Sequence, residues 1–463
     1  MDATRRSRPA DCAAAAVSGL RACVASALRR AGLEGARIAV ALSGGRDSSA
    51  LLDAAAELRG ELRFDLVAFH VHHGLSAHAD AWADLCRANC AALGVPLDIR
   101  RLDLARKSPA GIEAAARNGR YEALAELART HAIDAVLLAH HADDQAETVL
   151  LQLLRGSGPR GLAAMPVSTA DRGGVSTADR GVRWLRPLLE VPREAIDACV
   201  EARALRYVDD DSNADARHRR NALRGSVVPA LRAIAPGYPR TLVRAARLQA
   251  DAAALLDDLA AIDARDACDG HSLERSALCA LEPRRAANLL RWFLRGHDLP
   301  APSSARLSEM LRQLAHARDD AQVTLAHAGV VLGVHRGRIV VHRAPPDSWA
   351  QAWTGAGTVP LPHGTLRFVA ATGAGIAARR LEQSRVTIRA GVPGERLRLD
   401  GRARRPVAEL LREAGMPPWE RLAVPRVYCD DTLAAVAGIG VDADFGAAQG
   451  EASQLLEWQP ADR

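Results

Sequence analysis

The 463-residue chain is poor in lysine, paired cysteines and long apolar runs, and each shortage excludes a class of protein. Of its 61 basic residues only Lys107 is a lysine, so the chain has no GxxxxGK[ST] nucleotide loop. Its eight cysteines form no CxxC pair and are typical of scattered cytosolic thiols. No run of about 20 apolar residues is free of charge, and the run 13–17 is too short for a secretory leader. We therefore expect a cytoplasmic protein without a membrane segment.

The residues that are present predict a folded chain of several domains. Apolar residues make up 48% of it and the net charge is only +6, which excludes disorder for the bulk of the sequence. In the first half, apolar strand patterns alternate with helical ones, which predicts a doubly wound parallel α/β sheet with its ligand edge after the strands. The strand patterns are Arg37–Leu42, Phe64–Val71, Leu97–Leu102 and Asp134–Ala139.

Later segments change character. Helical patterns dominate after Pro229, and the last segment mixes strands with one helix. We predict an α/β domain over 1–228, a mainly helical domain over 229–345, a linker over 346–384 and a small α+β domain over 385–463. The heptamer VSTADRG occurs twice between Val167 and Gly181, which indicates a duplicated surface loop.

The basic charge is concentrated in one segment. Residues 216–248 contain eight arginines and no acidic residue. A solvated helix face normally mixes the two signs, whereas a stretch of one sign is typical of a surface that binds a polyanion. The segment therefore favours a nucleic-acid ligand.

The segment SGGRDSS, residues 43–49, lies between an apolar strand pattern and a helix. Adjacent glycines, Gly44 and Gly45, allow a tight turn that presents backbone N–H groups to an anion, and the helix N-terminus adds positive charge. Ser43 and Ser48 can donate hydroxyl hydrogen bonds, and Asp47 is a candidate ligand for Mg²⁺ on phosphates. The alternative is a glycine turn in which Asp47 or Ser48 only caps the helix.

The chain resembles the tRNA(Ile)-lysidine synthetases, a family within the N-type ATP pyrophosphatases. SGGRDS fits the SGGxDS loop of those pyrophosphatases, and five further segments follow in the order found in the family. These segments are FHVHHGL (69–75), EAAARNGRY (113–121), HHADDQAET (140–148), DDSNADARHRRNALR (210–224) and GMPPWER (415–421).

The resemblance implies a reaction and its substrates. Members of the family use ATP to adenylate the 2-oxo group of the wobble cytidine in a CAU-anticodon isoleucine tRNA. The ε-amine of free L-lysine then attacks that carbon, and AMP leaves. The resemblance therefore implies ATP and Mg²⁺ as cofactors and tRNA(Ile) and L-lysine as partners, and it leaves a homodimer open. It also implies that the loop and a following strand end hold ATP through Ser43, Gly44, Gly45, Arg46, Asp47, Ser48 and His70.

HHADDQAET is expected to supply an anionic pocket. If Asp143 opens a helix, Asp144 and Glu147 share a face, which suits the cationic groups of lysine and can help to deprotonate its amine. The alternative is that these carboxylates only favour the helix dipole, with His140 and the next histidine packing inside. We take His140, Asp144 and Glu147 as candidate catalytic residues, together with Asp47.

A metal-hydrolase site is a competing interpretation of the histidines. His70, His72, His73, His140 and Asp144 are all residue types that bind zinc. Such a site would leave the glycine loop without a role, so we favour the strand end near His70 as part of the nucleotide site.

Arginines complete the candidate site. Arg117 and Arg120 lie three residues apart on a predicted helix, and in the family this segment faces the reaction, where an arginine can neutralise developing charge. The alternative is a solvated face paired with Glu113 and Glu122. Arg220, Asn221 and Arg224 are candidates for binding the tRNA.

Three other functions compete with the ligase. A tRNA thiolase built on the same ATPase would normally need a cysteine pair, which is absent. Amide-forming synthetases give no reason for the acid-free arginine segment. An RNA-binding protein with an inactive nucleotide loop is opposed by the intact Ser43, Asp47, Asp144 and Glu147.

Overall fold

The computed structural model describes residues 9–72, 74, 78–102, 112–169, 182–209, 219–316, 323–343 and 348–460. The chain divides into two compact units, an N-terminal unit of residues 1–259 and a C-terminal unit of residues 260–463. None of the described helices is long and apolar enough to cross a membrane. His73 and most of the duplicated VSTADRG segment lie outside the described residues.

The N-terminal unit is built on a parallel five-stranded sheet, as the alternating patterns predict. Its strand order is β3-β2-β1-β4-β5, and every pairing along it is parallel. The buried strands have few polar side chains because both faces of the sheet are covered. The strands are β1 (Arg37–Ala41), β2 (Asp65–His72), β3 (Leu97–Arg101), β4 (Ala135–Leu137) and β5 (Trp184–Leu185).

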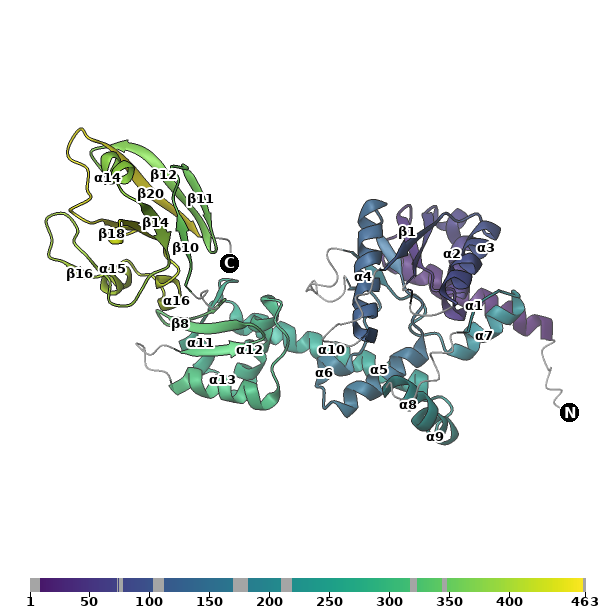
Figure 1. Cartoon of the computed structure of the whole chain (residues 1–463). Helices are drawn as coiled ribbons and strands as arrows, with labels where there is room; N and C mark the ends of the chain where they lie inside the picture. Colours follow the sequence, from purple (N-terminus) through teal and green to yellow (C-terminus); the bar gives the residue numbers. More distant parts are fainter. Residues whose placement is uncertain are drawn as a thin grey trace. The chain divides into compact units, whose positions relative to one another are not determined.

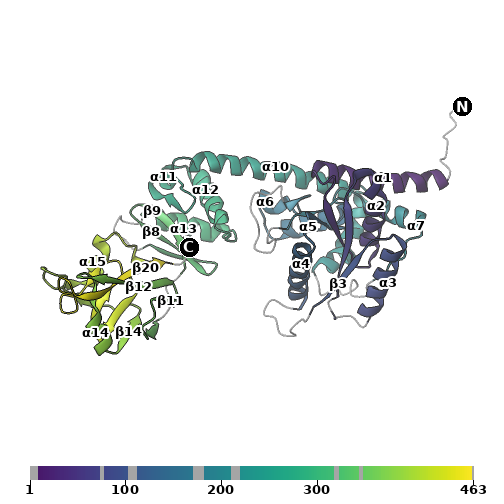
Figure 2. The ribbon, with the colours of Figure 1, turned by 90° about the horizontal axis from the view of Figure 1, so that it is seen from above.

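Helices cover the two faces of this sheet (Figure 2). Four helices bury their apolar residues on one face: α1 (Pro9–Arg30), α2 (Arg46–Leu62), α3 (Ala79–Ala92) and α7 (Arg193–Ala202). On the other face α4 (Ile112–Thr130) packs Leu124 and Leu127 against the sheet.

The strand order creates a switch point between β1 and β4. The chain leaves β1 toward β2 on one side and returns from β3 to β4 on the other, so the loops after β1 and β4 separate above the sheet. Ligands of doubly wound folds bind at such a point, at the carboxyl ends of the strands. The loop after β1 is the glycine segment, and β4 is followed by His140, His141 and α5 (Ala142–Leu154).

The arginine-rich segment belongs mostly to the N-terminal unit. There Ala246 packs with Val149 and Ala164 in a small cluster, and the compact unit reaches residue 259, beyond the α/β domain that we predicted over 1–228. The helices are α6 (Pro159–Leu162), α8 (Arg219–Ala222), the π-helical turn η3 (Leu223–Val227), α9 (Val228–Ile234) and the long α10 (Tyr238–Ala264), labelled in part in Figure 1.

The first part of the C-terminal unit combines helices with an antiparallel sheet of order β6-β9-β8-β7. Three helices pack around one apolar cluster with the sheet: α11 (Arg275–Ala280), α12 (Pro283–Gly296) and α13 (Ser304–His316). The strands are β6 (Ser272–Glu274), β7 (Thr324–His327), β8 (Val330–His335) and β9 (Arg338–His342).

The rest of the C-terminal unit holds a second apolar core between antiparallel strands. The range 346–384, which we predicted as a linker, contains β10–β13 and α14, because the nine-residue β12 pairs along its whole length with β20. One sheet is β10 (Ala350–Ala352), β14 (Val386–Arg389), β17 (Arg426–Cys429), β18 (Thr432–Val436) and β19 (Gly440–Val441). The other is β11 (Thr358–Leu361), β12 (Gly364–Thr372), β20 (Ala452–Pro460) and β13 (Ile376–Ala377). Shorter elements are α14 (Ala378–Gln383), β15 (Arg396–Leu397), β16 (Arg405–Pro406), α15 (Val407–Glu413) and α16 (Pro418–Arg421).

Trp419 of GMPPWER joins the two parts of this unit. Its ring stacks on His342 of β9 with centroids 4.3 Å apart and meets His335 of β8 edge-on. Gly333 lies under the indole, where a Cβ would collide with it. The tryptophan therefore packs within the protein.

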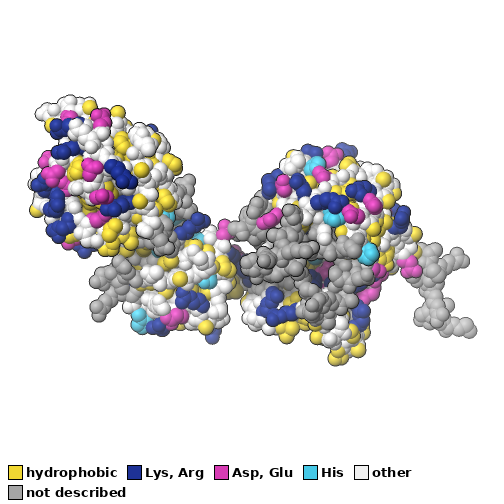
Figure 3. Space-filling model, viewed as in Figure 1, with side chains coloured by type: hydrophobic (Ala, Val, Ile, Leu, Met, Phe, Trp, Pro, Cys, Tyr) yellow, Lys and Arg dark blue, Asp and Glu magenta, His cyan; other side chains and the backbone are white. Residues whose placement is uncertain are grey.

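Several arginines on the surface of the C-terminal unit are paired with acids. On the face seen in Figure 3, basic and acidic side chains are intermixed. Arg398 pairs with Asp444, and Arg405 pairs with Glu409 and Glu413. This surface therefore lacks the single sign of the 216–248 segment.

Candidate active site

The glycine loop forms a closed turn before α2. The hydroxyl of Ser48 donates to the carbonyl of Gly45 at 2.9 Å and lies 3.0 Å from the hydroxyl of Ser43, which also accepts the Gly45 N–H at 3.3 Å. Gly44 has φ +86°, a backbone conformation that favours glycine. The two serines thus hold the loop in shape, and the N-terminus of α2 follows directly after it.

Cys86 of α3 lies directly beneath this loop. A Cβ added to Gly44 would come within 3.2 Å of the Cys86 sulfur. Burial raises the pKa of the Cys86 thiol to about 12, so the sulfur is an unreactive space-filling group. The sulfur also lies 3.5 Å from Nδ1 of His70, which donates to the Leu42 carbonyl at 2.8 Å. The strand end of β2 is thereby fixed against the end of β1.

A cleft of about 390 Å³ opens at the switch point of the sheet. Most of the predicted nucleotide-site residues line it, and so does Arg120, whereas Arg117 does not. Both arginines are exposed and lie over the ring of Tyr121. The predicted residues in its wall are Ser43, Gly45, Arg46, Asp47, Ser48, His70, Arg120, His140, Asp144 and Arg224. The structure therefore gathers residues from five distant segments around one space.

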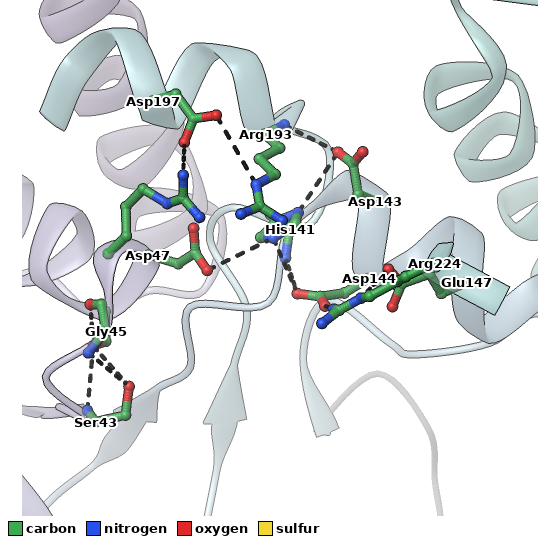
Figure 4. Close-up of polar contacts among 12 residues, drawn as sticks. Ser43, Gly45, Asp47, His141, Asp143, Asp144, Glu147, Arg193, Asp197 and Arg224 are labelled. Atoms are coloured by element: carbon green, nitrogen blue, oxygen red, sulfur yellow. Dashed lines mark hydrogen bonds and ion pairs between the residues drawn. The ribbon is translucent and has the colours of Figure 1, made fainter. Parts of the chain in front are cut away.

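His141 links the two sides of the cleft (Figure 4). Its Nε2 lies 3.7 Å from Asp47 Oδ2 and 3.5 Å from Asp144 Oδ2, and its backbone N–H donates to Asp144 at 3.1 Å. Our sequence prediction gave this histidine no role beyond packing. The signal was the adjacent acids of HHADD, which on one helical turn place carboxylates on either side of the ring.

The two histidines differ in charge state. Burial lowers the pKa of His140 to about 3, so it stays neutral at physiological pH. Burial also opposes charge on His141, but the carboxylates of Asp143, 3.7 Å from its Nδ1, and of the nearby Asp144 raise its pKa. These surroundings therefore favour the charged form of His141 and keep His140 neutral.

Asp144 and Glu147 share one face of α5 as predicted, and both pair with arginines. Arg220 Nε donates to Glu147 at 2.6 Å and its Nη2 to Asp144 at 2.9 Å. Arg224 Nε donates to Glu147 at 2.5 Å and its Nη2 to Asp144 at 3.2 Å. The predicted lysine pocket and two of the predicted tRNA-binding residues, which we treated as separate, thus form one cluster; Asn221 lies between the two arginines on α8.

Arg46 points away from the loop and toward α7. Its guanidinium donates to Asp197 at 2.6 Å and lies over the ring of Tyr207. Arg193, also in the cleft wall, donates its backbone N–H to Asp143 at 3.0 Å. Neither Arg193 nor Asp197 stood out in the sequence, because both fall in an ordinary amphipathic helix far from the motifs.

Asp47 is suited to hold a cation. Burial raises the pKa of its carboxyl, and among the described residues its Oδ1 is buried without a hydrogen-bond partner. A carboxylate oxygen at the edge of a phosphate loop is the ligand type that Mg²⁺ prefers. In the described part of the chain no three His, Cys, Asp or Glu residues are grouped to bind a metal by themselves, so the hydrolase interpretation gains no support there.

Comparisons with known proteins cover most of the chain. A family model described as a PP-loop domain matches residues 21–231. Models described as the TilS substrate binding domain and the TilS substrate C-terminal domain match residues 273–340 and 386–458.

Individual relatives match over nearly the same extent. The tRNA(Ile)-lysidine synthase of Nitrosomonas europaea is 37% identical over 435 residues, which cover 92% of this chain and 93% of that protein. The tRNA(Ile)-lysidine synthase of Azoarcus sp. is 41% identical over 429 residues and 92% of each chain. Among solved structures, the U34-tRNA thiolase NcsA of Methanococcus maripaludis is 19% identical with a TM-score of 0.43, covering 51% of this chain and 80% of that one.

Proposed function

The chain belongs to the tRNA(Ile)-lysidine synthase family, and on this basis we propose that it is an ATP-dependent carbon–nitrogen ligase. ATP adenylates the 2-oxo group of the wobble cytidine in CAU-anticodon tRNA(Ile), and pyrophosphate leaves. The ε-amine of free L-lysine then attacks that carbon, a proton is lost from the amine, and AMP leaves. The observation that carries the proposal is a cleft in which the phosphate loop with Asp47 faces His140 and Asp144.

The glycine loop is proposed to hold the triphosphate. Backbone N–H groups of Gly44 and the first turn of α2 are offered to the phosphate oxygens, and the helix dipole favours their charge. Because the hydroxyls of Ser43 and Ser48 hold one another, their contribution is mainly to keep this turn in shape. His70 fixes the neighbouring strand end through Leu42.

Asp47 is the proposed ligand for Mg²⁺. A bound Mg²⁺ would neutralise charge on the phosphates during adenylation. The unpartnered Oδ1 of Asp47 supports this role, and His141 on its other oxygen holds the carboxylate in place.

The lysine site is proposed at Asp144 and Glu147. Glu147 is buried and Asp144 is largely buried, both on one face of α5, and their charges are opposite in sign to the ammonium groups of free lysine. Neutral His140 lines the same cleft as Asp144, where its lowered pKa leaves it as a hydrogen-bonding group for the attacking amine and makes it a poor acceptor of the amine's proton. Arg120, in the cleft wall, is placed to neutralise charge that develops on the adenylated base; we assign Arg117, outside the wall, a supporting role.

The tRNA is proposed to lie along the arginine-rich segment. Arg220, Asn221 and Arg224 are next to the cleft and belong to this run of one sign. A cytoplasmic location follows from the tRNA substrate, and a homodimer remains a prediction. A thiolase reaction is not favoured, because the relatives that cover the chain are lysidine synthases.

The decisive measurement is AMP release from ATP by the purified protein with Mg²⁺ and CAU-anticodon tRNA(Ile), with lysine added or withheld. Lysine-dependent AMP release with lysine attached to the tRNA is the expected result. AMP release with attachment of another nucleophile would reject the assignment of Asp144 and Glu147. No AMP under any condition would reject the ligase.

A further inference from the structure

The carboxylates proposed to bind lysine are fully engaged within the protein. Both oxygens of Glu147 accept a guanidinium N–H, one from Arg220 and one from Arg224. Asp144 Oδ1 accepts from both arginines, and Oδ2 accepts the backbone N–H of His141. A lysine ammonium group entering this site would find each carboxylate oxygen already bonded.

The charges of the cluster cancel as well. Two carboxylates and two guanidinium groups sum to zero, so the closed cluster has no net attraction for a cationic amino acid. When both arginines leave, two largely buried negative charges remain, and these attract the ammonium groups of free lysine. Leaving a buried carboxylate unpaired costs free energy. The arginines therefore leave only when another cation neutralises the two carboxylates in their place.

The two arginines are the exposed members of the cluster. Their side chains keep 30% and 32% of their surface in solvent, whereas Glu147 and Asp144 keep 5% and 13%. Arg220 and Arg224 also lie in the acid-free segment, on α8 and on the π-helical turn η3. A π-helical turn is a rare local widening that is often found at functional sites. A phosphate diester can accept a guanidinium group in the same two-pronged way as a carboxylate.

We propose that Arg220 and Arg224 act as intramolecular stand-ins for lysine, and that tRNA phosphates draw them off Asp144 and Glu147 to open the lysine site. This proposal rests on the proposed function, since it assigns lysine to the same carboxylates. Lysine binding and tRNA binding then support each other, and free lysine does not fill the site before the tRNA arrives.

The coupling is reciprocal by thermodynamic necessity. If tRNA tightens lysine binding by a given factor, lysine tightens tRNA binding by the same factor. We expect at least about a tenfold effect, because couplings between two sites typically lie between 5-fold and 150-fold. The effect of tRNA on the lysine Kd and the effect of lysine on the tRNA Kd, measured independently, must therefore give the same factor.

The test is equilibrium dialysis of radiolabelled L-lysine against the full chain without ATP, with and without saturating CAU-anticodon tRNA(Ile). The expected result is a lysine Kd at least about tenfold lower with tRNA, and a tRNA Kd lowered by the same factor with lysine. Equal lysine Kd values with and without tRNA would overturn the proposal.

The variant R220Q/R224Q separates the arginines from other sources of coupling. It should bind lysine without tRNA more tightly than the unmodified chain does, and tRNA should then add little. Arg219→Gln is the matched control, because it removes one charge from the same helix and is not paired with Asp144 or Glu147. It should weaken tRNA binding slightly and keep the coupling.

Two results with the double variant would overturn the proposal: loss of lysine binding in a folded protein, or coupling that persists unchanged. If the double variant does not fold, the reciprocal pair of measurements on the unmodified chain decides. Attachment of lysine to tRNA in the presence of ATP is measured in parallel. Attachment without coupling rejects only the stand-in role, whereas no attachment and no lysine binding in any state rejects the proposed function itself.

Discussion

Each unit of the molecule buries arginine–carboxylate pairs, but the buried partner differs. In the N-terminal unit the carboxylates are buried, and Arg220 and Arg224 keep 30% and 32% of their side chains in solvent. In the C-terminal unit Arg426 is itself buried, with 3% exposed, and it pairs with Glu395 at 2.8 Å. Arg426 also donates to the Val424 carbonyl at 2.6 Å, and Gly391 leaves room for its guanidinium.

This difference separates a structural pair from an exchangeable one. A guanidinium that is enclosed on all sides cannot change partners without unfolding its surroundings, so the Arg426 pair fixes the C-terminal core. A guanidinium with a third of its surface in water can move to another anion at small cost. The same two side-chain types therefore stabilise one unit and can regulate the other.

The largest expected effect is on the structural pair. Glu395→Gln leaves a buried guanidinium uncompensated, which should lower the free energy of unfolding by about 3–5 kcal/mol. Urea denaturation followed by circular dichroism measures this change. The control is Glu457→Gln, whose carboxylate lies 3.7 Å from Arg367 with both side chains more than half exposed (59% and 56%). Equal losses from both changes would contradict the distinction.

Asp47 differs from both clusters because one of its oxygens lacks a partner among the described residues. Asp47→Asn should reduce AMP formation at least about 100-fold, since removing one charge-stabilising group from a reaction site typically has this effect. The folding stability should not fall, because a raised pKa means that the charged carboxylate destabilises the folded state at neutral pH. A variant that keeps AMP formation at saturating Mg²⁺ would refute the ligand role.

Glu147→Gln should lower activity strongly and the free energy of unfolding only slightly, whereas Glu395→Gln should mainly lower the free energy of unfolding. Loss of the charge should lower kcat/KM for lysine about 100-fold, because breaking one buried charge pair with a ligand costs about 2–5 kcal/mol. Unfolding should change by less than about 1 kcal/mol, since Arg220 and Arg224 can return to solvent. Steady-state lysine attachment and urea denaturation on the same sample give both numbers. A large loss of folding stability would show that Glu147, like Glu395, forms a structural pair and not an exchangeable one.

Among the arginine–carboxylate pairs, the smallest effect on folding stability is expected for the exposed pair of Asp269 and Arg338. Burial raises the pKa of Asp269, but hydrogen bonds from Ser272 and the amide of His271 outweigh it and lower the pKa to about 2. A lowered pKa adds stability that is present above about pH 4 and is lost as the pH falls toward 2. Asp269→Asn should therefore cost no more than about 1 kcal/mol at pH 7 and nothing near pH 2, which denaturation at both pH values can check.

Much of the N-terminal fold follows from the sequence because its signals are local. Alternating strand and helix patterns predicted four strands of the sheet and the doubly wound class, and the structure confirms them. The predicted strand Asp134–Ala139 shortens to Ala135–Leu137, because its last residues turn into the loop that carries His140. The spacing of HHADDQAET likewise placed Asp144 and Glu147 on one helix face.

The signals that failed are those that depend on distant partners. The range 346–384 reads as a linker because of its prolines, glycines and tryptophans, and only pairing with β20, about 90 residues later in the chain, makes β12 a strand. The pairing of Arg220 with Glu147 spans 73 residues and leaves no trace in either segment alone. Sequence patterns gave the residue types of the site, and the tertiary fold decided which of them meet.

The buried sulfur of Cys86 beneath the glycine loop makes local unfolding of the protein measurable through the reactivity of its cysteines. Cys86, Cys90 and Cys199 are buried in the N-terminal unit and Cys429 in the C-terminal unit, whereas Cys23 and Cys279 are exposed. A brief pulse of a thiol-alkylating reagent should therefore mark Cys23 and Cys279 in the intact protein and reach the four buried cysteines named above only where a unit opens. Mass spectrometry of the labelled peptides then measures the opening of each unit separately. Labelling of Cys86 measures the opening of the packing beneath the glycine loop.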